Sequence, residues 1–128
     1  MAIKFKVIEK GQPGVAGGGV KKYYASNQSS GEITLAKLTN SIEKVSTVSG
    51  ADIRAVLYAM VDVMKSSLAD GQIVRLGELG SLRINISSNG EETAEKVSAK
   101  SIKGAKTVFT PGSDLKELLK ILKYEKAW

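Results

Sequence analysis

The segment from residue 50 to residue 69 constrains the fold most, because it predicts a long helix with more apolar surface than one small chain can cover. Ser49 suits the N-cap, and Asp70-Gly71 is typical of a helix end. Apolar side chains recur at helical spacing, at Ile53, Val56, Leu57, Met60, Val61, Met64 and Leu68. We therefore expect the helix to be buried on two sides, against its own chain and against a partner.

The residues before this helix predict a β-hairpin and a shorter helix. Residues 3–8 alternate apolar side chains with lysines, and residues 20–28 are rich in aromatic and β-branched residues. The stretch 11-GQPGVAGGGVKKYY-24 connects them. It lacks the spacing of a phosphate-binding P-loop, since Val20 separates the last glycine from Lys21. Thr34 suits the N-cap of a helix whose apolar stripe is Leu35, Leu38, Ile42 and Val45.

After Gly71 the apolar period changes from helical spacing to alternation. Strands are predicted at 73–76, at 82–87 and at 107–109, and Asn89-Gly90 is the strongest hairpin signal in the chain. Pro111-Gly112 ends the last strand and precedes a final helix. The predicted order is hairpin, helix, helix, three strands and helix, which is an α+β fold.

Composition excludes several classes of function. The chain has no cysteine and no histidine, which removes most zinc sites and the commonest general base. Glu91, Glu92 and Glu95 read as an exposed charged loop, so we expect no metal, no cofactor, no small-molecule substrate and no enzyme activity. No apolar run is long enough to span a membrane, and the N-terminus lacks a secretion signal. A cytoplasmic protein is the simplest expectation.

The charge of +6 is concentrated at the two ends of the chain. Residues 1–31 carry five lysines and one glutamate, and residues 71–128 carry ten basic and seven acidic side chains. Such a balance favours a polyanionic partner.

The run from Thr34 to Lys123 resembles the bacterial HU and integration-host-factor family of architectural DNA-binding proteins. Two phrases carry the resemblance, 70-DGQIVRLGELGSLRI-84 and 109-FTPGSDLKELL-119, together with the order of two helices, three strands and a helix. The resemblance implies an intertwined homodimer in which a β-arm from each chain reaches around duplex DNA. It also implies nucleoid association. The apolar helix at 50–69 agrees with such a dimer.

The chain departs from that family in three places. The family's G-F-G turn is replaced by Glu78-Leu79-Gly80. The family's arm tip carries R-N-P-x-T-G, whose proline wedges between base pairs, whereas residues 87–106 contain no proline. The family also lacks the N-terminal segment, and the chain looks closest to an extended HU-like group. The sequence therefore predicts two parts, a β-hairpin extension at 1–31 and an HU-like DNA-binding domain at 32–128.

The basic side chains are the candidate DNA contacts, because each can neutralise a phosphate without reading sequence. The predicted set is Arg83, Lys96, Lys100, Lys103 and Lys106 in the arm, with Lys100, Lys103 and Lys106 on its returning side, and Pro13, Lys21 and Lys22 in the extension. The predicted dimer interface is Val56, Met60, Val61, Met64 and Phe109.

Two functions remain open at this point. One is a histone-like homodimer that compacts or bends duplex DNA with low sequence specificity. The other is an HU-derived dimer whose arm contacts a protein partner instead of DNA.

Overall fold

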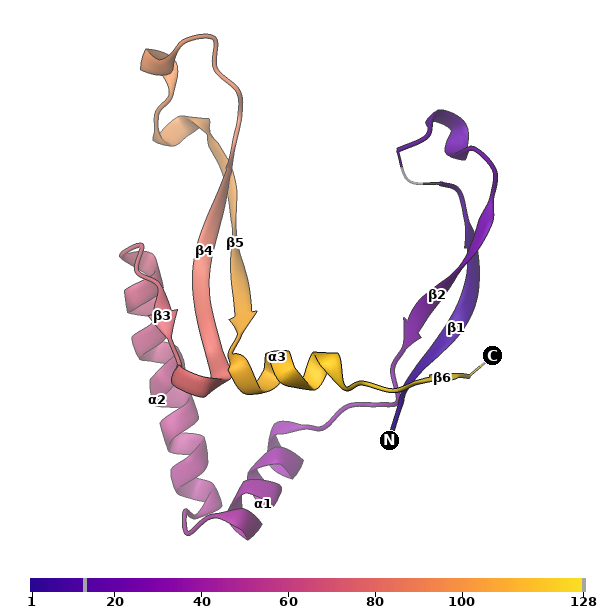
Figure 1. The fold of residues 1–128 in the computed structure, drawn as a ribbon. Helices are drawn as coiled ribbons and strands as arrows, with labels where there is room; N and C mark the ends of the chain where they lie inside the picture. Colours follow the sequence, from indigo (N-terminus) through magenta and orange to yellow (C-terminus); the bar gives the residue numbers. More distant parts are fainter. Residues whose placement is uncertain (13, 128) are drawn as a thin grey trace. The chain divides into compact units, whose positions relative to one another are not determined.

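The computed structural model describes residues 1–12 and 14–127. The described chain holds three α-helices and two three-stranded sheets, which confirms the α+β prediction (Figure 1). It divides into two compact units, one formed by Met1–Leu38 with Leu119–Trp128 and the other by Thr39–Leu118. The predicted division into parts at 1–31 and 32–128 stays a prediction.

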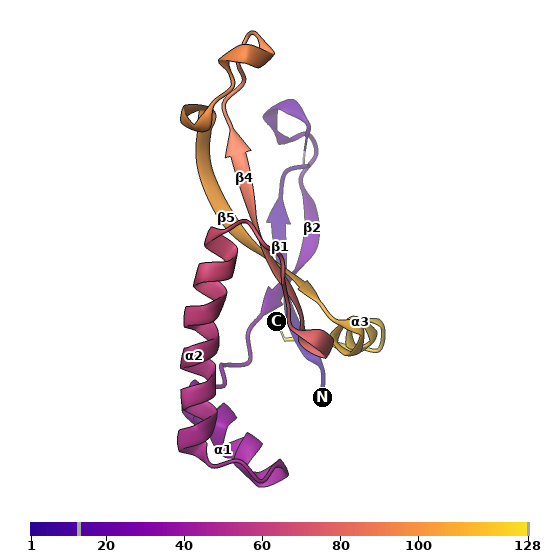
Figure 2. The same cartoon turned by 90° about the vertical axis from the view of Figure 1, so that its left-hand side faces the viewer.

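The first unit contains the predicted N-terminal hairpin. Strands β1 (Ile3–Lys10) and β2 (Lys22–Gln28) pair antiparallel, and their glycine-rich connection includes a short 3-10 turn, η1 (Ala16–Gly18) (Figure 2). A strand that the sequence did not predict, β6 (Tyr124–Lys126), adds parallel to β1. The backbone N–H of Ile3 donates to the carbonyl of Lys123 at 2.8 Å. The order β2-β1-β6 therefore joins the two ends of the chain in one sheet.

The first two helices begin where the capping residues predict. Helix α1 (Leu35–Val45) starts after Thr34, whose side-chain oxygen accepts from the backbone N–H of Lys37 at 3.3 Å. Helix α2 (Gly50–Ala69) starts after Ser49, whose side-chain oxygen accepts from the N–H of Asp52 at 3.2 Å. The chain then turns at Gly71, where φ is 82°. Local sequence thus sets the bounds of both helices.

The second sheet has the order β3-β4-β5, formed by β3 (Val74–Arg75), β4 (Gly80–Ser88) and β5 (Ile102–Pro111). A 3-10 turn, η2 (Gly77–Leu79), joins β3 to β4, and helix α3 (Ser113–Lys120) follows β5. Strands β4 and β5 form a long antiparallel arm that extends beyond β3 (Figure 1). The last strand is longer than the predicted 107–109, because β5 pairs along the whole of β4.

The hairpin signal at Asn89-Gly90 directly follows β4, which pairs with β5 as a hairpin. These two residues do not close the hairpin alone, because residues 89–101 form a broad tip with two 3-10 turns, η3 (Ala94–Lys96) and η4 (Ala99–Ser101). Ser101 organises this tip. Its carbonyl accepts from the N–H of Asn89 at 2.7 Å, and its hydroxyl donates to a carboxylate oxygen of Glu91 at 3.0 Å. These contacts outweigh the local preference for a two-residue turn.

Gly80 occupies a position that only glycine fits. Its φ is 138°, and an added Cβ would collide with the carbonyl oxygen of Thr110 and lie 3.0 Å from the ring of Phe109. We expect Gly80→Ala to lower the free energy of unfolding by about 3 kcal/mol in urea titrations. Gly90→Ala is the control, since its Cβ would meet no atom within 4 Å, and it should change stability by less than about 0.5 kcal/mol. Equal urea midpoints for the two variants would contradict the expected collision.

Candidate nucleic-acid interface

Strand register sorts the side chains of the arm onto two faces. Residues opposite each other on antiparallel strands share a face, and neighbours along a strand alternate. One face is apolar and carries the pairs Leu82–Phe109, Ile84–Thr107 and Ile86–Ala105. A cavity between this face and α2 is lined by Lys65, Leu68, Ala69, Ile84 and Thr107. The apolar face is therefore the side of the sheet that α2 approaches.

The other face carries cations, and we call Arg75, Arg83 and Lys106 the basic face. Arg75 pairs with Ser81, Arg83 follows two residues along β4, and Lys106 lies opposite Asn85. All three cations are exposed, and none forms an ion pair within the described residues. Three unpaired cations on one side of a sheet can each neutralise a phosphate.

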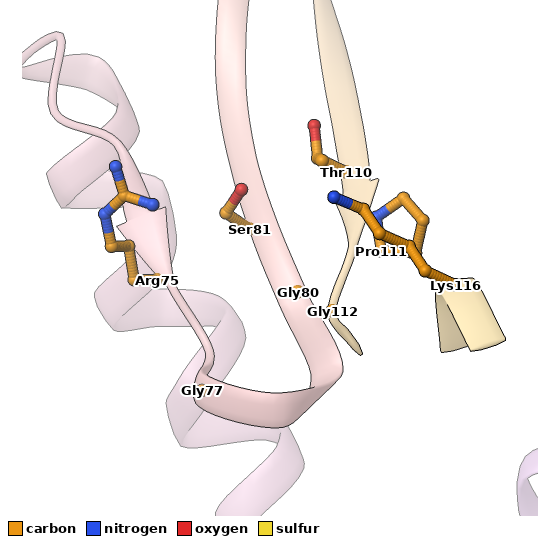
Figure 3. A pocket seen from close by; sticks show the side chains of 8 residues that line it. All are labelled: Arg75, Gly77, Gly80, Ser81, Thr110, Pro111, Gly112 and Lys116. Atoms are coloured by element: carbon orange, nitrogen blue, oxygen red, sulfur yellow. The ribbon is translucent and has the colours of Figure 1, made fainter. Parts of the chain in front are cut away.

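An open pocket of about 280 Å³ continues the basic face at its base. Figure 3 shows the side chains of Arg75, Ser81, Thr110 and Lys116 around it. Gly112, which lines the pocket, packs directly against the backbone of Glu78, and a Cβ at position 112 would collide with that backbone. Two cations and two hydroxyls in one open pocket suit an anion such as a phosphate. We call this the base pocket.

The predicted arm lysines do not lie in one row. Lys96 and Lys100 belong to the 3-10 turns of the tip, and Lys100 precedes the returning strand β5. Lys96 Nζ is 3.6 Å from Glu92 Oε2, an exposed pair that contributes little to stability. Lys103 is the bulged residue, because β4 passes from Ser87 opposite Gly104 to Ser88 opposite Ile102. Within the arm, only Lys106 and Arg83 share the basic face.

The extension's predicted contacts are separated by the hairpin. Lys22 begins β2, and Lys21 lies just before that strand. Pro13 falls outside the described residues. The glycine-rich loop closes through the N–H of Gln12, which donates to the carbonyl of Gly18 at 2.6 Å. No helix begins at the two lysines, so a phosphate loop of the P-loop kind does not form.

The predicted dimer residues lie on surface that a single chain leaves uncovered. Val56 is 63% exposed, Val61 is 51% exposed and Phe109 is 46% exposed, whereas Met60 and Met64 are half-buried. Among the described residues, Ile53, at 7% exposure, is the one large hydrophobic side chain that is buried. Such a core is too small to stabilise a chain of 128 residues by itself.

Arg75 was not among the predicted contacts, because it occupies a strand of only two residues. Lys116 lies in the final helix, where its sequence position favours a solubilising role, with a contact to flanking DNA as the weaker alternative. Their shared pocket depends on the pairing of β3 with β4 and on the turn at Gly112, and neither is visible in local sequence.

Within the described part of the chain, no group of three or more Asp or Glu side chains could hold a metal ion. A search of the described helices for one long and apolar enough to cross a membrane found none.

Comparisons with known proteins agree with this geometry. Residues 1–126 match the model of the HU-HIG family, described as an HU domain fused to wHTH, Ig, or glycine-rich motif. A similar solved structure is that of a candidate bacterial DNA-binding protein from Bacteroides vulgatus ATCC 8482, with a TM-score of 0.67 and 12% identity. The alignment covers 98% of this chain and 48% of the other, so the chain spans about half the length of that protein. No curated protein matches.

Proposed function

Because the chain belongs to the HU-HIG family, that of an HU domain fused to wHTH, Ig, or glycine-rich motif, we propose that it is a histone-like architectural protein that binds duplex DNA. The observation that carries the proposal is the register of the second sheet, which gathers Arg75, Arg83 and Lys106 on one face and the apolar side chains on the other. The HU-like family is non-enzymatic, and we assign the chain no reaction.

The proposed contacts are mainly to phosphates, which gives low sequence specificity. The chain has two prolines, Pro13 and Pro111, and neither lies in the tip at 89–101. The arm therefore lacks a proline to wedge between base pairs, and compaction would follow from charge neutralisation and wrapping. The proposed contact set is Arg75, Arg83, Lys96, Lys100, Lys103, Lys106 and Lys116, with Pro13, Lys21 and Lys22 in the extension.

A homodimer completes the proposal. A second copy of the HU-like part would cover Val56, Met60, Val61, Met64 and Phe109. The support is energetic, because three of these side chains are about half exposed or more in one chain and burial of apolar surface contributes about 25 cal/mol per Å². In this proposal residues 32–128 form the dimeric DNA-binding domain, residues 1–31 form an extension, and the protein acts in the cytoplasm at the nucleoid.

The rival function is a dimer whose arm contacts a protein partner. Charge reversal of the basic face separates the two functions. We expect Arg83→Glu with Lys106→Glu to weaken binding to a random-sequence duplex by about 100-fold at about 0.1 M salt, because two attractive phosphate contacts become repulsive. Fluorescence anisotropy with a labelled duplex measures the affinity.

The control is Lys44→Glu with Arg54→Glu, which changes the net charge equally at two exposed positions on α1 and α2. This control should bind DNA within a few-fold of the unaltered chain. If the basic-face variant folds and binds DNA as well as the control, the arm does not contact DNA and the rival function is favoured.

A further inference from the structure

The sheet of the first unit also has two chemically different faces. Strand register places Lys4, Lys6 and Lys10 of β1 on the same side as Lys22 of β2, and we call these four side chains the lysine face. Ile8, Tyr24, Ser26 and Gln28 complete that side of the hairpin. Along β1 the lysines at positions 4 and 6 are about 7 Å apart, since a strand rises about 3.4 Å per residue.

The four lysines are exposed and available to a ligand. Lys6 and Lys22 form no ion pair with any residue that the structure describes. The Nζ of Lys10 lies 5.1 Å from the centre of the Tyr24 ring, which holds that ammonium over the sheet. On the two hairpin strands this face carries no carboxylate, because Glu9 lies on the opposite side. Glu125 of β6 is opposite Lys4 and is the nearest acidic position in the register.

The opposite face of the same sheet is mostly apolar, with Glu9 of β1 and Lys126 of β6 as its charged side chains. Ile3, Phe5, Ala25, Asn27 and Tyr124 line a cavity of about 250 Å³ there together with Ser26. A sheet with one apolar side normally packs that side against protein and leaves the other side in water. The lysine face is therefore the side that meets solvent. An ordinary solvated face mixes both signs of charge, whereas the hairpin shows only cations on this side.

We propose that the lysine face is a second DNA-binding surface, which contacts the phosphates of duplex DNA independently of the arm. The inference rests on the proposed function, because it takes the same ligand, and it adds a separate site on the other compact unit. An anionic membrane matches this face less well than DNA does. Proteins that bind membrane surfaces insert exposed apolar side chains that lie among their cations. The apolar side chains of the lysine face, Ile8 and Tyr24, are half-buried in the protein.

The first test is lysine acetylation of the full chain with and without a random-sequence duplex, followed by mass spectrometry. Phosphates in contact with an ammonium group shield it from the reagent. Lys6 and Lys22 should lose reactivity at least threefold when DNA is added, and Lys44 on α1 should not change. Equal reactivity of Lys6 and Lys22 with and without DNA overturns the inference. Because the test uses the unaltered chain, its result does not depend on whether a variant folds.

The second test is the salt dependence of DNA binding by the variant Lys6→Gln with Lys22→Gln. Each phosphate contact contributes about −0.9 to the slope of log affinity against log salt, so the slope should become shallower by about two per chain, or about four for the proposed dimer. At about 0.1 M salt the affinity should fall at least tenfold. The matched control, Lys44→Gln with Arg54→Gln, removes the same charge and should leave the slope unchanged.

The possible outcomes separate this inference from the proposed function. If the basic-face variant loses DNA binding while Lys6→Gln with Lys22→Gln retains the full slope, the arm binds DNA and the lysine face does not. If the lysine-face variant loses only its sedimentation with phosphatidylglycerol vesicles, the face binds membranes and the inference is overturned. If the unaltered chain does not bind duplex DNA, both proposals are wrong.

Discussion

The variant Val56→Lys is expected to lose both its dimer and its cooperative fold. Within one chain Val56 is 63% exposed, and a lysine at such a position normally changes stability by less than about 0.5 kcal/mol. In the proposed dimer the same side chain is buried against a second copy. An unpaired buried charge costs about 3–5 kcal/mol, which is much of the stability of a small domain. Urea titrations and sedimentation velocity measure the two effects.

Ser66→Lys is the control, because Ser66 is exposed and lies on the side of α2 away from Met64 and Val61. It should leave the dimer and the unfolding midpoint almost unchanged. The unaltered chain should also melt at a higher temperature as protein concentration rises, as an obligate dimer does. A monomeric unaltered chain, or equal midpoints for Val56→Lys and Ser66→Lys, would contradict the dimer.

The helices could be predicted because their signals are local. Thr34 and Ser49 accept the hydrogen bonds that the capping pattern predicts, and α2 ends at Asp70-Gly71. Strand β6 could not be predicted in this way. Three residues are too few to show the alternation of apolar and polar side chains that predicts a strand. The strand forms because Ile3 and Phe5 of β1, at the other end of the chain, supply its backbone hydrogen-bond partners.

The tip of the arm shows how far a local signal reaches. Asn89-Gly90 is a strong local turn signal, but Ser101 and Glu91 form contacts across the tip that a two-residue turn would not allow. Such contacts join residues about ten positions apart, so local propensity does not reveal them. Local signals are therefore reliable in this chain where a helix begins and unreliable where two strands must find their register.

Only part of the candidate site was predictable from the sequence, as single residues and not as a surface. Alternation along 82–87 placed Arg83 on the polar side of its strand. The addition of Lys106 and Arg75 to the same side, and the exclusion of Lys103, depend on the pairing of β4 with β3 and β5 and on the bulge after Ser87. The same reason applies to the lysine face, whose four members come together only through the register of β1 with β2.

Binding of duplex DNA through phosphates makes the affinity depend on salt. Each neutralised phosphate releases condensed counterions, so log affinity should fall linearly with log salt. Arg75, Arg83, Lys106 and Lys116 contribute about −4 to the slope per chain, or about −7 for the proposed dimer, and contacts from the four lysines of the lysine face would double this to about −14. A slope of about −7 corresponds to a loss of about 10⁴-fold in affinity between about 50 and 200 mM salt.

Anisotropy titrations of the full chain with a random-sequence duplex across that salt range are the most direct test. We expect tight binding at about 50 mM salt and a linear log–log plot with a slope of about −7 or steeper. Absence of binding at about 50 mM salt, or an affinity that does not change with salt, would contradict it.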